Sequence, residues 1–126
     1  MKILHIIPRI GNGGAELFLL DLVKEQSALG HQVSLCSFRD LTEDFYLSKI
    51  GNASFISLSK KDGLSLSLFF KVFSLIKKEK PEIVNCHLPS VFLYVLLPLF
   101  FFKKTKFFYT IHNEPLKEEP RLIIRK

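Results

Sequence analysis

The sequence predicts an α/β fold, an open parallel sheet with helices on both faces in the Rossmann-like arrangement. Segments typical of strands and of helices alternate along the 126 residues. The strand-like segments are nearly continuous apolar runs, which parallel strands need because both of their faces are buried. A glycine-rich turn, Gly11 to Gly14, separates the first strand from the first helix. The length suits one domain spanning residues 1–126.

Each element has its own signal in the sequence. Strands are expected at residues 2–7, 31–38, 53–58, 82–86 and 106–111, and helices at 15–29, 64–80 and 89–102. The first helix should end at Gly30 and the second at Pro81, since these residues commonly terminate helices. The chain after His112 is polar and becomes apolar again only in "RLIIRK", to which no element is assigned. Right-handed crossovers would place the first and fourth strands side by side.

The apolar stretch "LPSVFLYVLLPLFFF" at 88–102 raises the question of a membrane span. It is about five residues shorter than the roughly 20 that a spanning helix needs. Pro89 and Pro98 also interrupt it, and we expect Pro98 to break the helix. A buried helix, with one face open to lipid at most, is therefore favoured over a span.

Charge and cysteine content narrow the class of protein. The net charge is +6, and residues 64–126 hold eleven basic and five acidic side chains. This excess fits an anionic partner, such as a membrane surface or a phosphorylated substrate, or simply a solvated helix face. Cys36 and Cys86 lie in strand-like settings without metal-ligand spacing, which indicates reduced core thiols in a cytoplasmic protein. No signal peptide is recognisable, and no motif favours nucleic-acid binding.

Three polar segments follow predicted strands: Arg9 to Gly14, His87 to Pro89, and His112 to Glu114. Carboxyl ends of parallel strands share one edge of the sheet, where ligands bind in such folds. Glycines before a helix let free backbone N–H groups approach a phosphate. The alternative interpretation is that these glycines only form a tight turn. The dinucleotide fingerprint fails because Glu16 occupies its third glycine position, and no Lys-Ser/Thr pair completes a nucleotide P-loop.

Four motifs occur in an order and spacing that resemble a known family. They are "IIPRIGNGGAE", "ALGHQVSLCSF", "PEIVNCHLPS" and "FFYTIHNEP". Together they resemble the family-4 glycosyltransferases, retaining enzymes with two Rossmann domains (the GT-B fold). The resemblance covers essentially the whole chain and matches the N-terminal, acceptor-side domain of that fold.

The resemblance implies roles for particular residues. His112 would be the catalytic residue that points at the transferred sugar, with Asn113 beside it as a substrate-binding residue. Gly13 and Gly14 would lie against the diphosphate of the donor, and His87 would line the same cleft, unless it only packs or caps. Glu16 matches an acidic position of the family, as a substrate-binding residue or as a helix cap. We interpret His5 and His31 as structural.

The implied enzyme transfers a sugar from a nucleoside-diphosphate donor to a hydroxyl of a glycan or glycolipid acceptor. It would require no metal or other cofactor, and it would serve bacterial surface polysaccharide or glycolipid synthesis. The donor-binding domain of the family is absent from these 126 residues, so we expect an incomplete N-terminal domain that is inactive alone.

We also expect a cytoplasmic location, in which Lys103, Lys104 and Lys106 hold the chain at the anionic inner face of the membrane. Two alternatives stay open. One is a Rossmann-like nucleotide-binding module with other chemistry, and the other is a small membrane-associated protein built around residues 88–102.

Overall fold

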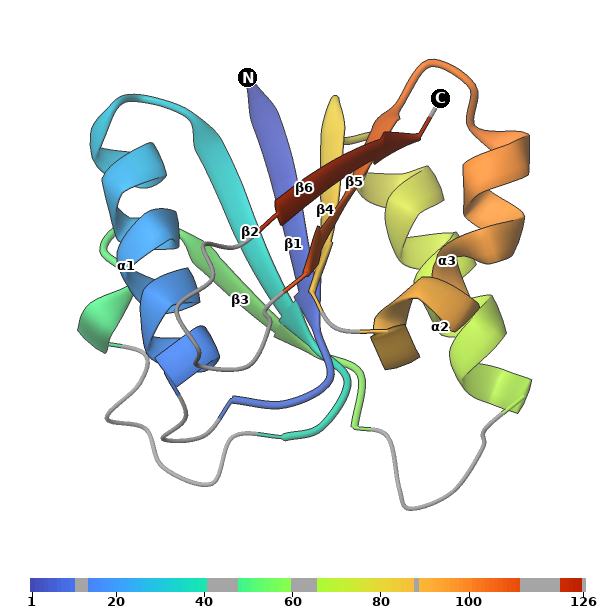
Figure 1. Cartoon of the computed structure of the whole chain (residues 1–126), viewed down its shortest axis with the longest axis horizontal. Helices are drawn as coiled ribbons and strands as arrows, with labels where there is room; N and C mark the ends of the chain where they lie inside the picture. The colour runs from blue at the N-terminus through green and yellow to red at the C-terminus, as the bar shows by residue number, and fades with distance from the viewer. Residues whose placement is uncertain (11–13, 41–47, 60–65, 88, 112–120, 126) are drawn as a thin grey trace.

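A six-stranded sheet forms the centre of the protein (Figure 1), in a computed structural model that describes residues 1–10, 14–40, 48–59, 66–87, 89–111 and 121–125. The strand order is β3-β2-β1-β4-β5-β6. The strands are β1 (Lys2–Ile7), β2 (Gln32–Ser37), β3 (Ser54–Ser57), β4 (Ile83–His87), β5 (Lys106–Ile111) and β6 (Arg121–Arg125).

The five strands predicted from the sequence are confirmed, and all of them are parallel. β1 lies in the middle, where it pairs with β2 on one side and with β4 on the other. The order therefore reverses between β1 and β4, as in a doubly wound sheet, and this reversal is the point where ligands bind in such folds.

A sixth strand was not predicted. β6 pairs with β5 in the antiparallel direction, with Phe107 opposite Arg125 and Ile111 opposite Arg121. The run "RLIIR" is short and has a basic residue at each end, so it carries little strand signal of its own. The backbone groups along the outer side of β5 provide the pairing that the local sequence does not indicate.

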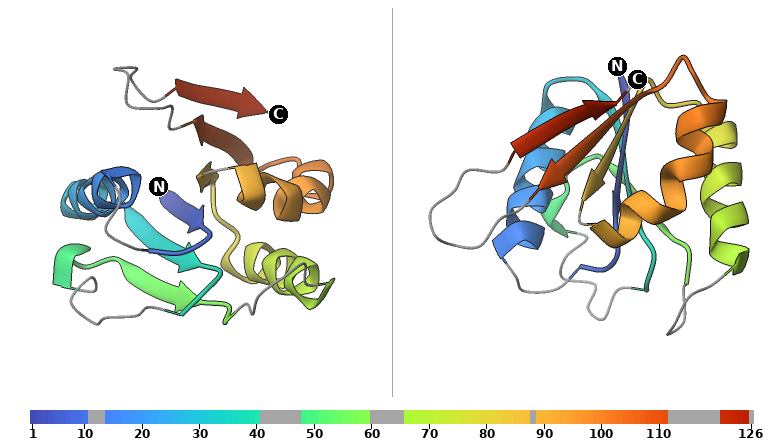
Figure 2. Two further views of the ribbon diagram at one scale, coloured as in Figure 1. Left: turned by 60° about the horizontal axis from the view of Figure 1, so that its bottom comes forward. Right: turned by 45° about the vertical axis from the view of Figure 1, so that its right-hand side comes forward.

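Helices cover both faces of the sheet, as Figure 2 shows. They are α1 (Gly14–Ala28), α2 (Leu66–Glu79) and α3 (Pro89–Phe101). α1 lies on one face, whereas α2 and α3 lie side by side on the other. The predicted helices are confirmed within about two residues at each end, which is the usual uncertainty of helix boundaries.

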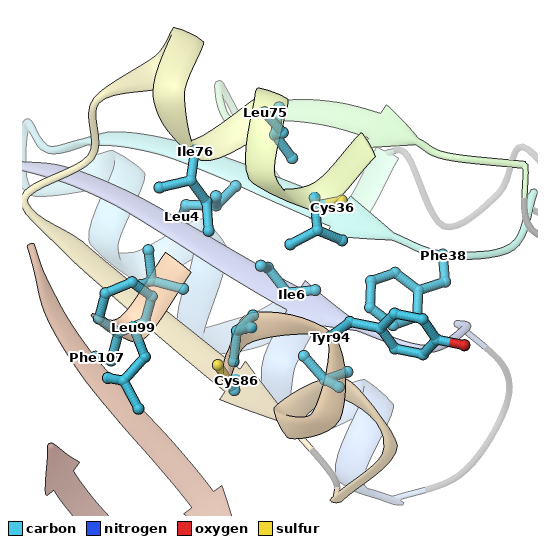
Figure 3. Packing of buried hydrophobic residues seen from close by; sticks show 14 of the residues in the cluster. Leu4, Ile6, Cys36, Phe38, Leu75, Ile76, Cys86, Tyr94, Leu99 and Phe107 are labelled. Atoms are coloured by element: carbon cyan, nitrogen blue, oxygen red, sulfur yellow. The ribbon is translucent and has the colours of Figure 1, made fainter. Parts of the chain in front are cut away.

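Alternation along the strands divides the apolar side chains between two cores. Leu4 and Ile6 of β1 point toward α2 and α3 (Figure 3), together with Phe107 of β5. Ile7 of β1 belongs instead to the core under α1, with Leu20 and other apolar residues of that helix. Both faces of the central strand are thus buried, which explains its predominantly apolar sequence; His5 is the polar exception among its buried residues.

Pro98 does not break α3, contrary to the sequence expectation. The helix continues to Phe101, and the amide of Phe102 still donates to the carbonyl of Pro98 at 2.8 Å. Proline removes one helical hydrogen bond, but Val95 and Leu99 on either side of it are buried in the core and hold the segment in place. In the described part of the chain, no helix is long and apolar enough to cross a bilayer.

The two cysteines are buried in the core beneath α2 and α3, and both are free thiols. Burial raises the pKa of Cys36 and of Cys86 to about 12, because an apolar surrounding disfavours the thiolate. A thiol that stays protonated is a poor nucleophile and metal ligand, so the prediction of core cysteines is confirmed.

Candidate functional site

The candidate site lies at the carboxyl end of the sheet, where β1, β4 and β5 finish side by side. The parallel register places Ile6 beside Cys86, and His87 beside Thr110. α1 begins at Gly14, immediately after the segment that leaves β1 (Figure 1). The chain therefore leaves three neighbouring strands at one end of the sheet, as the order of elements predicted.

Three of the predicted site residues, Gly13, His112 and Asn113, lie outside the described residues, and their roles stay predictions. Gly14 is the first residue of α1, and Glu16 lies in its first turn. Backbone N–H groups in the first turn of a helix have no partner within the helix, and the helix dipole makes this end positive. The position of Gly14 therefore suits an anion, while its contact with a donor also stays a prediction.

His87, the last residue of β4, is fully buried. Its Nε2 lies 3.1 Å from Nδ1 of His5 on the neighbouring strand β1. The two rings are 5.3 Å apart between centroids and inclined by 36°. The His87 ring is thus inside the fold rather than on an open surface, and its predicted contact with substrate stays a prediction.

His5 connects this pair to α1. Its second nitrogen, Nε2, lies 2.7 Å from Oε1 of Gln26. A carbonyl oxygen only accepts, so Nε2 of His5 carries a hydrogen and donates it. Burial lowers the pKa of His5 to about 4, and the hydrogen bond to Gln26 opposes this only partly. The ring is therefore neutral near pH 7, and its Nδ1 accepts a hydrogen bond from Nε2 of His87.

A second buried polar contact lies on the same side of the sheet. Oγ1 of Thr110 on β5 donates to Oδ1 of Asn85 on β4 at 2.8 Å. Asn85 and His87 are two residues apart in one strand, so they point to the same face. Sequence reasoning missed Asn85, Thr110 and Gln26. The alternation Asn85, Cys86, His87 in an otherwise apolar strand was the available signal.

The two faces of β4 consequently differ in character. Val84 and Cys86 face the apolar core under α2 and α3, whereas Asn85 and His87 face the side of α1. Buried polar groups are costly unless they are hydrogen-bonded, and among the described residues no buried side-chain nitrogen or oxygen lacks a partner. The polar side of β4 is therefore a satisfied network that fixes the ring of His87 relative to β1 and α1.

The burial of His5 predicts a stability that depends on pH. The folded pKa is about 4 and the ordinary value is 6.5, so the unfolded chain binds this proton first as the pH falls. Stability is complete above pH 6.5 and is lost progressively toward pH 4, by roughly 3 kcal/mol for this group. Urea unfolding at several pH values measures the loss.

The variant His5→Gln is the control for this prediction, because it keeps a polar side chain and removes the titration. We expect it to be less stable at pH 7 but to show a clearly shallower dependence between pH 6.5 and 4. Equal slopes in the two proteins would assign the acid sensitivity to other groups.

No three histidine, cysteine, aspartate or glutamate side chains gather into a possible metal site within the part of the chain that the structure describes. The metal independence implied by the family resemblance stays a prediction, because several polar residues at this end of the sheet lie outside that part.

Comparison with known proteins shows which family this chain belongs to. The model of Glycosyltransferase Family 4 matches residues 12–125, which is nearly the entire chain. The chain belongs to this family, and the resemblance seen in its motifs is confirmed. No curated protein matches the sequence significantly.

A solved structure supports the same fold. A glycosyltransferase from Rickettsia africae ESF-5 superposes with a TM-score of 0.63 over 90% of this chain, at 22% sequence identity. At 22% identity, this similarity shows a shared fold and nothing more specific. The chain covers 31% of the length of the Rickettsia protein, so it corresponds to about a third of that glycosyltransferase.

Proposed function

We propose that this chain is the N-terminal, acceptor-side domain of a retaining glycosyltransferase. The enzyme would transfer a sugar from a nucleoside-diphosphate donor to a hydroxyl of a glycan or glycolipid, in bacterial surface polysaccharide or glycolipid synthesis. The observation that carries the proposal is the family match over residues 12–125, on a sheet whose order reverses between β1 and β4.

In this proposal the start of α1 receives the diphosphate of the donor. Charge develops on the diphosphate as the sugar leaves, and preorganised dipoles stabilise such charge without reorganisation. The N–H groups near Gly13 and Gly14 would supply part of that stabilisation, with no side chain in the way of the phosphate. The family resemblance suggests that no metal is required for this step.

The remaining predicted residues would act around the sugar. His112 follows β5 directly and would position the sugar or its hydroxyl groups, with Asn113 next to it. His87 would line the same cleft from the interior of the fold, because its ring is held by His5 within the polar network of β1, β4 and α1. Glu16, in the first turn of α1, would stabilise the positive helix end or contact substrate.

Tight binding of a donor requires protein on both sides of its diphosphate. An anion held on one side only remains in contact with water, where electrostatic stabilisation is weakest. The chain covers 31% of the length of the Rickettsia glycosyltransferase. The donor-binding domain of the family would supply the other side of the donor site. We propose that these 126 residues alone neither transfer sugar nor bind a donor tightly, and that the complete enzyme works in the cytoplasm.

Calorimetry and turnover assays test this proposal. A panel of nucleotide-sugars is titrated into the 126-residue chain and into a longer protein that joins it to a donor-binding domain. We expect measurable transfer by the longer protein only. Micromolar donor binding by the short chain would instead favour a self-sufficient nucleotide-binding module.

Gly14→Val in the longer protein is expected to abolish transfer, since a branched side chain would stand where the phosphate approaches. Ala28→Val, at the opposite end of α1, is the matched control and should leave transfer nearly unchanged. Circular dichroism verifies that both variants fold. Normal turnover in Gly14→Val would remove the start of α1 from the donor site.

A further inference from the structure

The outer surface of α2 and α3 is unusually apolar for a face turned to solvent. Leu66 and Phe70 on α2 are 72% and 73% exposed, and Leu97 and Phe100 on α3 are 60% and 66% exposed. Single exposed apolar residues need no explanation, but a contiguous patch usually marks an interaction site. We call this surface the α2–α3 face; its residues are Leu66, Phe69, Phe70, Phe73, Leu93, Leu97, Phe100 and Phe101.

The patch is continuous across the two helices. Spacings of three and four residues place Leu66, Phe70 and Phe73 on one side of α2. The ring of Phe73 lies 5.1 Å, between centroids, from the ring of Phe101 on α3. An apolar hollow lies between the helices and is lined by Leu66, Phe69, Phe70, Phe73 and Leu97.

Basic side chains gather at one end of this face. α2 and α3 both run back from the carboxyl end of the sheet, so their last turns lie at the same, opposite end (Figure 2). A second hollow there is lined by lysines of both segments together with Phe101, Phe102 and one acidic residue, Glu82; the lysines are Lys77, Lys80, Lys103 and Lys104. Lys78 is also exposed in the last turn of α2, whereas Lys71 lies earlier in the helix and its Nζ donates to the carbonyl of Leu58 at 3.1 Å.

Carboxylates offset only part of the positive charge of this cluster. Between residues 66 and 106 the chain has two acidic residues, Glu79 and Glu82, and seven lysines. Both acidic side chains contact Lys2 of β1: Oε1 of Glu79 lies 3.5 Å from its Nζ, and Oε1 of Glu82 accepts from its backbone amide at 3.0 Å. The face therefore combines exposed phenylalanines with an excess of positive charge, although Glu82 also lines the lysine hollow.

We infer that the α2–α3 face docks the protein on an anionic lipid surface. Phenylalanine and leucine side chains enter the boundary between headgroups and acyl chains, while the lysines contact the negative headgroups. A second copy of the chain fits less well, because its own face carries the same excess of lysines over carboxylates. Contact is peripheral, since none of the described helices is long enough to span a bilayer.

This surface is separate from the candidate site. The lysine end of the α2–α3 face lies opposite the carboxyl end of the sheet, so docking leaves that end free. The inference does not depend on sugar transfer, because vesicle binding requires neither a donor nor a second domain. If the experiments refute sugar transfer, the lipid-docking inference is unaffected, and the reverse also holds.

Co-sedimentation with vesicles tests the inference on the 126-residue chain. One set of vesicles is phosphatidylcholine alone, and in the other about a third of the lipid is phosphatidylglycerol. We expect binding to the anionic vesicles that is at least about tenfold tighter, since each lysine near the surface contributes about fivefold. Binding should weaken in high salt, which screens the headgroup charge.

Two variants separate the apolar and the basic contributions. Phe70→Ser with Phe100→Ser should reduce binding to both kinds of vesicle, and Lys103→Gln with Lys104→Gln should reduce only the preference for anionic vesicles. The matched controls are Leu29→Ser, at a residue 75% exposed after α1, and Lys24→Gln on α1 itself. All four positions that carry the test changes are exposed, so the fold should persist.

Three results would overturn the inference. One is no binding to anionic vesicles by a folded chain. Another is binding that Leu29→Ser weakens as much as the double phenylalanine variant does. The third is a dimer in light scattering that the double phenylalanine variant dissociates, without any vesicle binding, which would assign the face to a second copy.

Discussion

Replacing His112 with alanine is expected to lower sugar transfer by roughly 10- to 1,000-fold in a protein that joins this chain to a donor-binding domain. The residue directly follows β5, whose carboxyl end lies beside that of β4. A polar group positioned near the reacting centre stabilises the transition state more than the ground state, so turnover should fall more than donor affinity. Steady-state kinetics with donor and acceptor varied separately distinguishes the two effects.

His31→Ala is the matched control for this change. His31 precedes β2 at the opposite end of the sheet, where its Nδ1 lies 3.2 Å from the N-terminal amine of Met1. Its removal should leave turnover unchanged. If both histidine variants lost activity equally, a general effect on folding would explain the loss, and His112 would have no special place in the reaction.

Truncating Phe38 to alanine is expected to destabilise the domain by about 3–5 kcal/mol, the usual range for a buried phenylalanine. Phe38 follows β2, is 2% exposed, and packs edge-on against Tyr94 of α3 with ring centroids 5.3 Å apart. The substitution leaves a cavity between the sheet and α3 (Figure 3), while the amide of Phe38 keeps its bond to the carbonyl of Ile7. Urea unfolding of the 126-residue chain measures the loss.

Phe100→Ala is the comparison for the second prediction, since the same side chain is 66% exposed on α3. We expect a change well below that of Phe38→Ala, because little apolar area leaves water at this position on folding. A loss in Phe38→Ala as small as the one expected for Phe100→Ala would mean that the contact of Phe38 with Tyr94 is not part of the cooperative core.

The five parallel strands could be predicted because burial on both faces demands apolar runs that are visible in the sequence. β6 could not, because its pairing depends on the outer side of β5 rather than on its own residues. The helix around Pro98 was misjudged for a similar reason. Packing of Val95 and Leu99 against the core outweighs one lost hydrogen bond, and local sequence does not report packing.

The candidate site was predictable only in part. The glycine turn and the histidine after β5 are recognisable as motifs, and parallel topology brings their strands together. The partners of His5 are not recognisable in this way, since His87 is 82 residues away and Gln26 is 21 residues away. Such contacts become apparent only once the order of the strands is known.

The central place of β1 has a consequence for the order in which the protein folds. β1 is synthesised before the other described strands, yet one of its two neighbours is β4, which pairs Ile3 with Ile83. Until β4 has left the ribosome, one side of β1 lacks its native partner and His5 lacks its partner His87. Joining segments so distant in sequence costs loop-closure entropy before it brings any contact, and this slows folding. During synthesis one edge of β1 therefore stays unpaired until β4 is complete, and an unpaired strand edge is prone to mispairing.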